Sequence, residues 1–392
     1  MAWELATFSA DLLELDPAEI EALAATEDAL TGLEVDVVGP GARVRVTHVL
    51  DALEPRVRVR EGRTNRLDGV VVLSCLDFPG EERPLHEQEA IVDLAGPAAD
   101  LTPLAGIVNV VLTFRPREGA GHVALDEAAR RVTLAVAELL TRPTLAAEPI
   151  AVERFELGPA DESLPAVAAL IQLSDLGQLY TQWIDGVAAG EAGLPRAVPP
   201  EFLLDTHVVC GEYHWAALRN PTLFFQQNAL VRALVREHGK RLRLAGIVLM
   251  RGYEQTAEDK ERAAERVAEL ARELGADGAI ITTDAGGNSH TDVMLTCRAC
   301  ERADVRTSVI VAEMADPEST NPGLTDWVPE ADCIVSAGNA EELAPEWTPE
   351  RVIGGDLLLD GTPAREPRPI PVRNYLGATN QMGQLVLTAT TW

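Results

Sequence analysis

The second half of the chain alternates strand patterns with amphipathic helix patterns. FFQQNALVRALVREHG (224–239) predicts a helix, LRLAGIVLM (242–250) has the length of a buried strand, and AEDKERAAERVAELARELG (257–275) repeats apolar residues at helical spacing. GAIITTD, SHTDVMLTCRACERA, TSVIVAE and ADCIVSAG then predict strand, helix, strand and strand. Because such alternation requires crossover connections, it predicts a parallel, three-layer α/β sheet.

The first half carries shorter β-type runs between clusters of Gly, Pro and Asp. Between residues 33 and 114 these include LEVDVVG, ARVRVTHVL, GVVVLSCL and IVNVVLTF, a pattern typical of a mostly antiparallel sheet. Residues 1–30 predict an acidic amphipathic helical segment, and 125–142 predict a helix. The fold class is therefore α/β, with a β-rich α+β domain at 1–205 and an α/β domain at 206–392.

Composition limits the partners of this chain. At 392 residues it is long enough for two cores, and its net charge of −29 argues against nucleic acid, which needs a basic surface. Its apolar runs are too short to span a bilayer, and MAWELATFSADLLELD lacks the basic start and apolar core of a signal peptide. Five scattered cysteines suit a reducing compartment. We therefore expect a cytoplasmic protein without a membrane or nucleic-acid partner.

Lysine is scarce, because Lys240 and Lys260 are the only lysines among 33 basic residues. A Schiff base formed by a protein amine would have to use one of them. The apolar spacing around Lys260 points it toward solvent, and Lys240 ends a predicted helix, where it complements the helix dipole. Any carbonyl–amine chemistry would more easily place the carbonyl on the protein.

A Gly-rich loop follows GAIITTD and opens the next predicted helix. Backbone amides and a helix N-terminus hold anions in such a turn, and ligands of open α/β sheets bind at the carboxyl ends of strands. AGGNSH lacks the full G-x-G-x-x-G pattern, so the nucleotide signal is weak. Two interpretations remain: a tight turn capped by Asn288 or Ser289, or a substrate carboxylate or phosphate bound by Gly286, Gly287, Asn288 and Asp292.

Cys297 and Cys300 form a C-x-x-C pair that lies a turn or two inside a predicted helix. A thioredoxin-type pair stands at the start of a helix, where the dipole lowers the thiol pKa. A zinc site would need a second pair of ligands, which Cys75, Cys210 and Cys333 do not supply. We therefore predict buried or half-buried helix cysteines and no metal.

The stretch LLDTHVVCGEYHW (203–215) places Cys210 between His207 and His214. Three interpretations stay open on the residues alone. Cys210 is a core thiol at the end of a strand, or the three side chains bind zinc without an evident fourth ligand, or cysteine and histidine form a nucleophile pair.

Taken end to end, the chain resembles the precursor subunit of component B of the glycine/sarcosine/betaine reductases, whose relatives include the D-proline reductase proprotein. The resemblance covers nearly the whole chain, and the order and spacing of its motifs are specific. These motifs are VLDALEPRVRV, GRTNRLDGVVV, DLAGPAADLTPLAGIVNVVLTFRP, NPTLFFQQNALVRALVREHGK, GADGAIITTDAGGNSHTD and NYLGATNQMGQLVLTATTW.

The resemblance implies that Cys210, which precedes the NP-x-x-x-x-QQN helix, becomes a pyruvoyl group by self-cleavage. The thiol would add to the carbonyl of Val209 to give a thioester, and β-elimination and hydrolysis would leave a ketone. His207 or His214 would supply the base, and Gly211 would relieve crowding of the backbone.

The resemblance also implies how the ketone works. It would condense with the amine of a small-molecule substrate and draw electrons from the C–N bond. A thiolate or selenolate of a second component B subunit would then attack, in a hetero-oligomer. Two other classes stay open: an unprocessed scaffold subunit of such a complex, and a cofactor-binding oxidoreductase that uses loop 284–292.

Overall fold

A six-stranded sheet carries the second half of the chain. In the computed structural model, which describes residues 3–77, 89–177, 181–211, 220–284, 286–315 and 323–383, its strand order is β14-β16-β11-β17-β18-β19. Every neighbouring pair is parallel except the one that joins β14 to β16. The strands are β11 (Ala166–Ser174), β14 (Arg196–Val198), β16 (Arg243–Gly252), β17 (Gly278–Thr282), β18 (Arg306–Glu313) and β19 (Ile334–Asn339). The predicted parallel α/β sheet is confirmed.

The first parallel strand, β11, lies between the second and the third, β16 and β17. This is the doubly wound order 2-1-3-4-5, in which crossovers leave in opposite directions from the first strand. Ligands in such sheets bind outside the carboxyl ends of the two strands where the direction reverses. Here these ends belong to β11 and β17.

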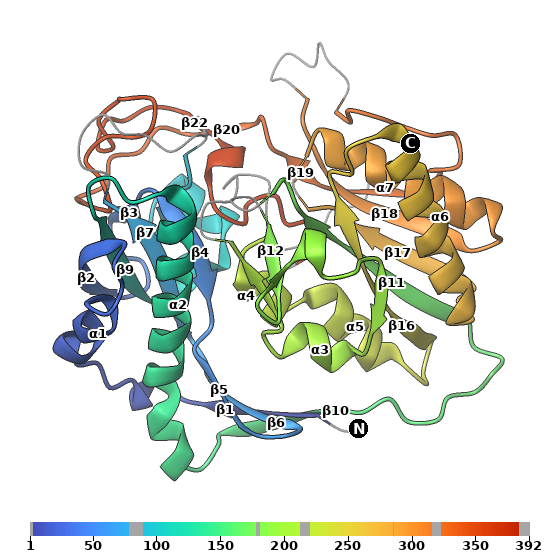
Figure 1. Cartoon of the computed structure of the whole chain (residues 1–392), viewed down its shortest axis with the longest axis horizontal. Coiled ribbons are helices and arrows are strands. Elements are labelled where there is room, and N and C mark those ends of the chain that lie inside the picture. The colour runs from blue at the N-terminus through green and yellow to red at the C-terminus, as the bar shows by residue number, and fades with distance from the viewer. Residues whose placement is uncertain are drawn as a thin grey trace.

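Alternate residues of β11 face two cores, which makes three layers. Ala168 and Leu170 pack against α6 and α7, whereas Ala169 and Ile171 pack on the opposite face with α3, α4 and α5. Figure 1 shows α6 and α7 together along one side of the sheet. The helices are α3 (Pro200–Leu204), α4 (Thr222–Gln226), α5 (Ala229–Glu237), α6 (Ala257–Glu273) and α7 (Asn288–Arg302).

Several smaller sheets form the rest of the molecule, with antiparallel and parallel pairs mixed. A four-stranded sheet contains β2 (Leu30–Val38), β9 (Val108–Pro116), β7 (Val70–Leu76) and β4 (Val49–Leu53). Another contains β10 (Ala151–Phe155), β1 (Trp3–Phe8), β6 (Arg63–Leu67) and β5 (Arg56–Arg60). The remaining strands are β3 (Val44–Val46), β8 (Val92–Asp93), β12 (Gln182–Ile184), β13 (Val187–Ala188), β15 (Val208–Cys210), β20 (Leu343–Ala344), β21 (Arg351–Ile353) and β22 (Ile370–Pro371).

Two helices cover the β2-β9-β7-β4 sheet. The long α2 (His122–Thr141) buries Leu125, Val132 and Val136 against Val72 and Leu112 of the sheet. The shorter α1 (Pro17–Ala24) completes this core, and Figure 1 shows both helices on the same side. The first residues form β1 rather than the predicted helix, because they pair with β6 and β10.

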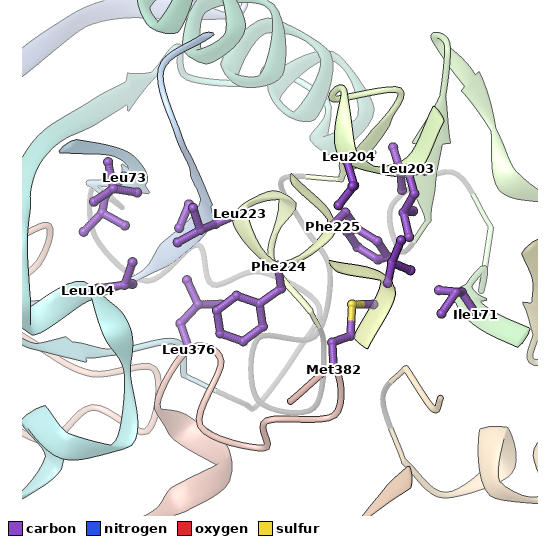
Figure 2. Packing of buried hydrophobic residues seen from close by; sticks show 14 of the residues in the cluster. Leu73, Leu104, Ile171, Leu203, Leu204, Leu223, Phe224, Phe225, Leu376 and Met382 are labelled. Atoms are coloured by element: carbon purple, nitrogen blue, oxygen red, sulfur yellow. The ribbon is translucent and has the colours of Figure 1, made fainter. Parts of the chain in front are cut away.

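One apolar core joins the two halves of the chain. Figure 2 shows Phe224 and Phe225 of α4 between Leu73 of β7 and Ile171 of β11. The C-terminal Met382 belongs to the same cluster. The predicted boundary at 205/206 does not separate the sheets, since β11 and β14 precede it and belong to the C-terminal sheet.

Candidate functional site

Cys210 is the last residue of β15 and has no exposed surface. It lies opposite Gln182 in the antiparallel pairing of β12 with β15, and Val209 lies opposite Trp183. The backbone N–H of Cys210 donates to Thr222 Oγ1 at 2.8 Å. The nitrogen of the candidate scissile bond is therefore held by a hydroxyl on the next helix, α4.

Thr222 is itself held by Asp51 of β4. Its hydroxyl donates to Asp51 Oδ2 at 2.5 Å, and its backbone N–H donates to Asp51 Oδ1 at 2.9 Å. Because Thr222 is the first residue of α4, this carboxylate also satisfies one of the unpaired N–H groups at the helix start. Asp51 and Thr222 are both completely buried.

Gly211, directly after Cys210, lies in a space that admits no side chain. Its N–H donates to the carbonyl oxygen of Thr181 at 2.9 Å. A Cβ atom at this position would lie 2.6 Å from that oxygen and 3.6 Å from Oδ1 of Asp126. Packing therefore requires glycine at position 211. The buried carboxylate of Asp126, on α2, lies close to the backbone at this position.

A guanidinium lies beside this carboxylate. Arg130 Nε is 3.8 Å from Asp126 Oδ2, and the guanidinium stacks over the Trp183 ring at 3.9 Å. Since Trp183 pairs with Val209, charged groups of α2 reach the strand pair that contains the candidate scissile bond.

His207 does not lie beside Cys210. His207 precedes the first residue of β15 (Val208–Cys210), and its ring is held by other residues. The His207 ring stacks on Phe202 at 4.4 Å, its Nδ1 contacts Asp185 Oδ1, and Arg58 Nη2 lies 3.1 Å from its Nε2. Because arginine can only donate, Nε2 accepts and Nδ1–H donates to the carboxylate. Both nitrogens are engaged away from the thiol. His214, the other predicted base, lies outside the described residues.

Asp284 lies where the carboxyl ends of β11 and β17 meet. Its Oδ1 accepts from the backbone N–H of Asn220 at 2.7 Å and from Asn220 Nδ2 at 2.8 Å. Its Oδ2 accepts from Gln182 Nε2 at 2.6 Å and from Ser174 N–H at 3.2 Å. Complete burial raises the pKa of Asp284, and these donors oppose the rise. Gln182, the strand partner of Cys210, and Asn220, which follows Cys210 in the chain, are thus both tied to the reversal point of the sheet.

The predicted Gly-rich loop opens α7 at this same place. Gly287 has a φ of 66° and precedes the first helical residue, Asn288, which is exposed. The carbonyl oxygen of Gly286 accepts from Tyr253 Oη at 2.9 Å and from Ser289 Oγ at 3.2 Å. Gly286 is buried, so the more accessible part of the loop is Gly287 and Asn288.

Asp292 is committed to internal contacts. Lys260 Nζ donates to its Oδ1 at 2.6 Å, and the Tyr253 N–H donates to its Oδ2 at 2.7 Å. The expectation that Lys260 points toward solvent is wrong, because its side chain reaches across from α6 to this carboxylate and is 10% exposed. The pair connects α6 to the first turns of α7.

Cys297 and Cys300 are buried inside α7, as predicted. Burial raises the pKa of Cys300 to about 12, and it also raises the pKa of Cys297. Such thiols are poor nucleophiles at neutral pH. Across the described residues, no cluster of three His, Cys, Asp or Glu side chains is arranged to hold a metal ion.

Comparison with known proteins adds the family. The family model of glycine/sarcosine/betaine reductase component B subunits matches residues 3–364. This chain belongs to that family.

Relatives of the component B family align along nearly the whole chain. The sarcosine reductase complex component B subunit alpha of Peptoclostridium acidaminophilum is 30% identical over 99% of this chain and 93% of its own length. The glycine reductase complex component B subunits alpha and beta of Acetoanaerobium sticklandii are 28% identical over 97% and 94%. The betaine reductase complex component B subunit alpha of P. acidaminophilum is 27% identical over 90% and 85%. The chain is thus a reductase-complex subunit, and no helix in the described ranges is long and apolar enough to cross a bilayer.

The component B motifs of this chain converge on Cys210. Asp51 comes from VLDALEPRVRV, Asn220 and Thr222 from NPTLFFQQN, and Asp284 from the GADGAIITTD stretch. Sequence reasoning used these motifs for recognition but assigned no role to their acids. The one sequence signal that could have identified Asp51 and Asp284 as site residues is that both lie within these motifs. Asp126 lies outside the motifs and could be found only from the structure.

Proposed function

We propose that this chain is the precursor subunit of a component B, in which Cys210 forms a pyruvoyl group by cleavage after Val209. The main support is the arrangement around the bond: Thr222 holds the Cys210 nitrogen, and the packing at Gly211 admits no side chain. A ketone in this position would bind a substrate amine and withdraw electrons from its C–N bond. The relatives named for glycine, sarcosine and betaine reductases suggest a small amine of this class as the substrate.

The residues around Cys210 fit the formation of such a group. Its thiol lies in the interior, where bulk water is excluded from competing with the attack on Val209. Asp51, through Thr222, and Asp126, beside Gly211, place two buried carboxylates near the reacting backbone. The contacts of His207 point elsewhere, so we place the proton-handling groups in this set of acids.

We infer that the turn at Gly287 and Asn288 receives the acidic end of the substrate. The positive end of α7 and the backbone N–H groups of its first turn favour an anion here. Gly286 and Asp292 hold the turn through Tyr253 and Lys260. Replacing Gly287 by a bulky residue should impair turnover while the fold stays intact, and normal turnover would remove this turn from the site.

We further infer that a second component B subunit supplies the nucleophile and the electrons. Cys297 and Cys300 are buried with raised pKa values and form no disulfide. A thiolate or selenolate on a partner chain would attack the α-carbon of the activated substrate, so that a C–S or C–Se bond forms while the C–N bond breaks and its electron pair stays with the nitrogen. Activity of the isolated chain with an amine and a small dithiol would contradict this assignment.

The decisive test of the proposed function is the mass of the purified chain under denaturing conditions. Cleavage gives a fragment of 209 residues and the remaining 183 of the 392. The smaller fragment should begin with a carbonyl, resist Edman degradation and react with hydrazines or borohydride. Cys210→Ala should remain full length, and Cys210→Ser should cleave more slowly because a hydroxyl is a weaker nucleophile. A wild-type chain that stays intact in its active complex would favour the scaffold alternative.

A further inference from the structure

A chain of two hydrogen bonds connects the backbone nitrogen of Cys210 to the hydroxyl of Thr222 and then to the carboxylate of Asp51. The N–H of Cys210 donates to Thr222 Oγ1 at 2.8 Å, and that hydroxyl donates to Asp51 Oδ2 at 2.5 Å. None of the three residues is exposed to solvent. Asp51 is fixed in turn, because its N–H donates to Ser74 Oγ at 3.0 Å across the β4–β7 pair.

We propose that Thr222 and Asp51 act on the Val209–Cys210 bond itself, by stabilising the positive charge that develops on the Cys210 nitrogen when the bond breaks. This inference rests on the proposed function, because it concerns the formation of the pyruvoyl group. Thr222 contacts the reacting nitrogen and is the catalytic residue. Asp51 acts through Thr222 and is a positioning residue.

The chemistry of the first step explains the need for this pair. A bond forms between Cys210 Sγ and the carbonyl carbon of Val209, the C–N bond breaks, and the thiol proton moves to the nitrogen. The products are a thioester and an amine, so the step needs neither oxidant nor reductant. The nitrogen changes from a weakly basic amide to an amine that carries positive charge on protonation. A buried carboxylate, reached through one hydroxyl, stabilises that charge strongly where water is excluded.

The same pair also has a structural role, which variants can separate from catalysis. Asp51 Oδ1 accepts the backbone N–H of Thr222 at the start of α4, and a change at the Thr222 side chain leaves that bond in place. Thr222→Val preserves the shape of the side chain and removes the hydroxyl. Thr222→Ser restores the hydroxyl. Asp51→Asn preserves the shape of the acid and an acceptor oxygen but removes the charge.

The experiment follows cleavage of the full-length chain over time by denaturing mass spectrometry. Thr222→Val and Asp51→Asn should slow cleavage on the order of 100-fold, the typical contribution of a positioned proton-handling group. Thr222→Ser should cleave close to the wild-type rate. Thr141→Val is the matched control, because within the described residues this buried hydroxyl donates only to the carbonyl oxygens of Ala137 and Glu138 in its own helix α2.

Hydroxylamine provides a second measurement that a purely structural role would not change. It splits a thioester after Val209 and leaves Cys210 with a normal amine, which Edman degradation detects. If the pair acts on the first step, folded Thr222→Val and Asp51→Asn chains should yield less of this product than the wild type. Thermal unfolding verifies that each variant is folded, and Asp51→Asn carries the test alone if Thr222→Val does not fold.

The outcomes are distinguishable. A wild-type chain that never cleaves overturns the proposed function and this inference with it. A wild-type chain that cleaves, together with folded variants that form thioester and cleave at the wild-type rate, overturns this inference and leaves the proposed function standing.

Discussion

Asn220 binds Asp284 through both its backbone and its side chain. The N–H and Nδ2 of Asn220 lie 2.7 and 2.8 Å from the same carboxylate oxygen, at the carboxyl end of β17. Gln182, the strand partner of Cys210, donates to the other oxygen at 2.6 Å. One buried carboxylate therefore fixes the chain on both sides of the candidate cleavage segment.

We expect Asp284→Asn to destabilise the protein by about 1–3 kcal/mol, since its amide would face donors that now bind Oδ2. The loss should depend on pH. Burial raises the pKa of Asp284 above its ordinary value of 3.8, so the folded state holds the proton more tightly than the unfolded state. The contribution of Asp284 to the free energy of unfolding is therefore full below pH 3.8 and declines as the pH rises through the folded pKa. Urea unfolding at several pH values should therefore show the wild-type advantage narrowing from acid toward neutral pH. A constant difference would contradict the assignment.

Gly211→Ala should prevent or strongly slow cleavage. The added Cβ would meet the Thr181 carbonyl at 2.6 Å, so β12 and β15 would have to separate, at a cost of about 1–3 kcal/mol. Gly32→Ala is the control, because a Cβ there meets nothing within 4 Å. Denaturing mass spectrometry would compare the two variants. Equal cleavage in both would show that crowding at Gly211 does not matter for the reaction.

The two fragments should stay together after cleavage. β11 comes from the N-terminal fragment and lies between β16 and β17 of the C-terminal fragment. Buried polar contacts add to this: Gln226 Oε1 accepts from the N–H of Glu54 at 2.8 Å. Size-exclusion chromatography should give one peak that contains both fragments, and denaturant should release them. Separate elution under native conditions would be inconsistent with this sheet order.

His290 should make stability sensitive to acid. Burial lowers its pKa from 6.5 to about 4, so the folded state favours the neutral ring. The contribution of this neutral ring to the free energy of unfolding is complete above pH 6.5 and is lost as the pH falls through about 4. The total loss expected from this difference in pKa is about 3 kcal/mol. His290→Asn retains an acceptor for the Thr325 N–H, now received by Nδ1, but does not titrate. The difference between the two chains in urea unfolding should shrink by about that amount between pH 7 and pH 4, and an unchanged difference would refute the prediction.

Local sequence patterns predicted the elements whose apolar spacing is regular. The order β16, α6, β17, α7, β18 and β19 follows the predicted alternation, and α2 covers the predicted helix near 125–142. The single helix expected at 224–239 is two helices, α4 and α5, because Asn228 caps the second through the N–H of Val231. β11 was missed, since a short apolar run does not distinguish a central strand from other buried segments.

The sequence by itself determined the parallel α/β half, the family and the cysteine on which the proposed chemistry depends, because these are encoded in local periodicity and in ordered motifs. Only the tertiary structure decided which groups meet at Cys210. Asp51 is 171 positions from Thr222, and Asp284 is 64 positions from Asn220. His207, only three residues before the thiol, is held instead by Asp185, Arg58 and Phe202. Proximity in the chain did not give proximity in space, because the sheet order and the shared core, rather than the local sequence, bring distant carboxylates to one buried bond.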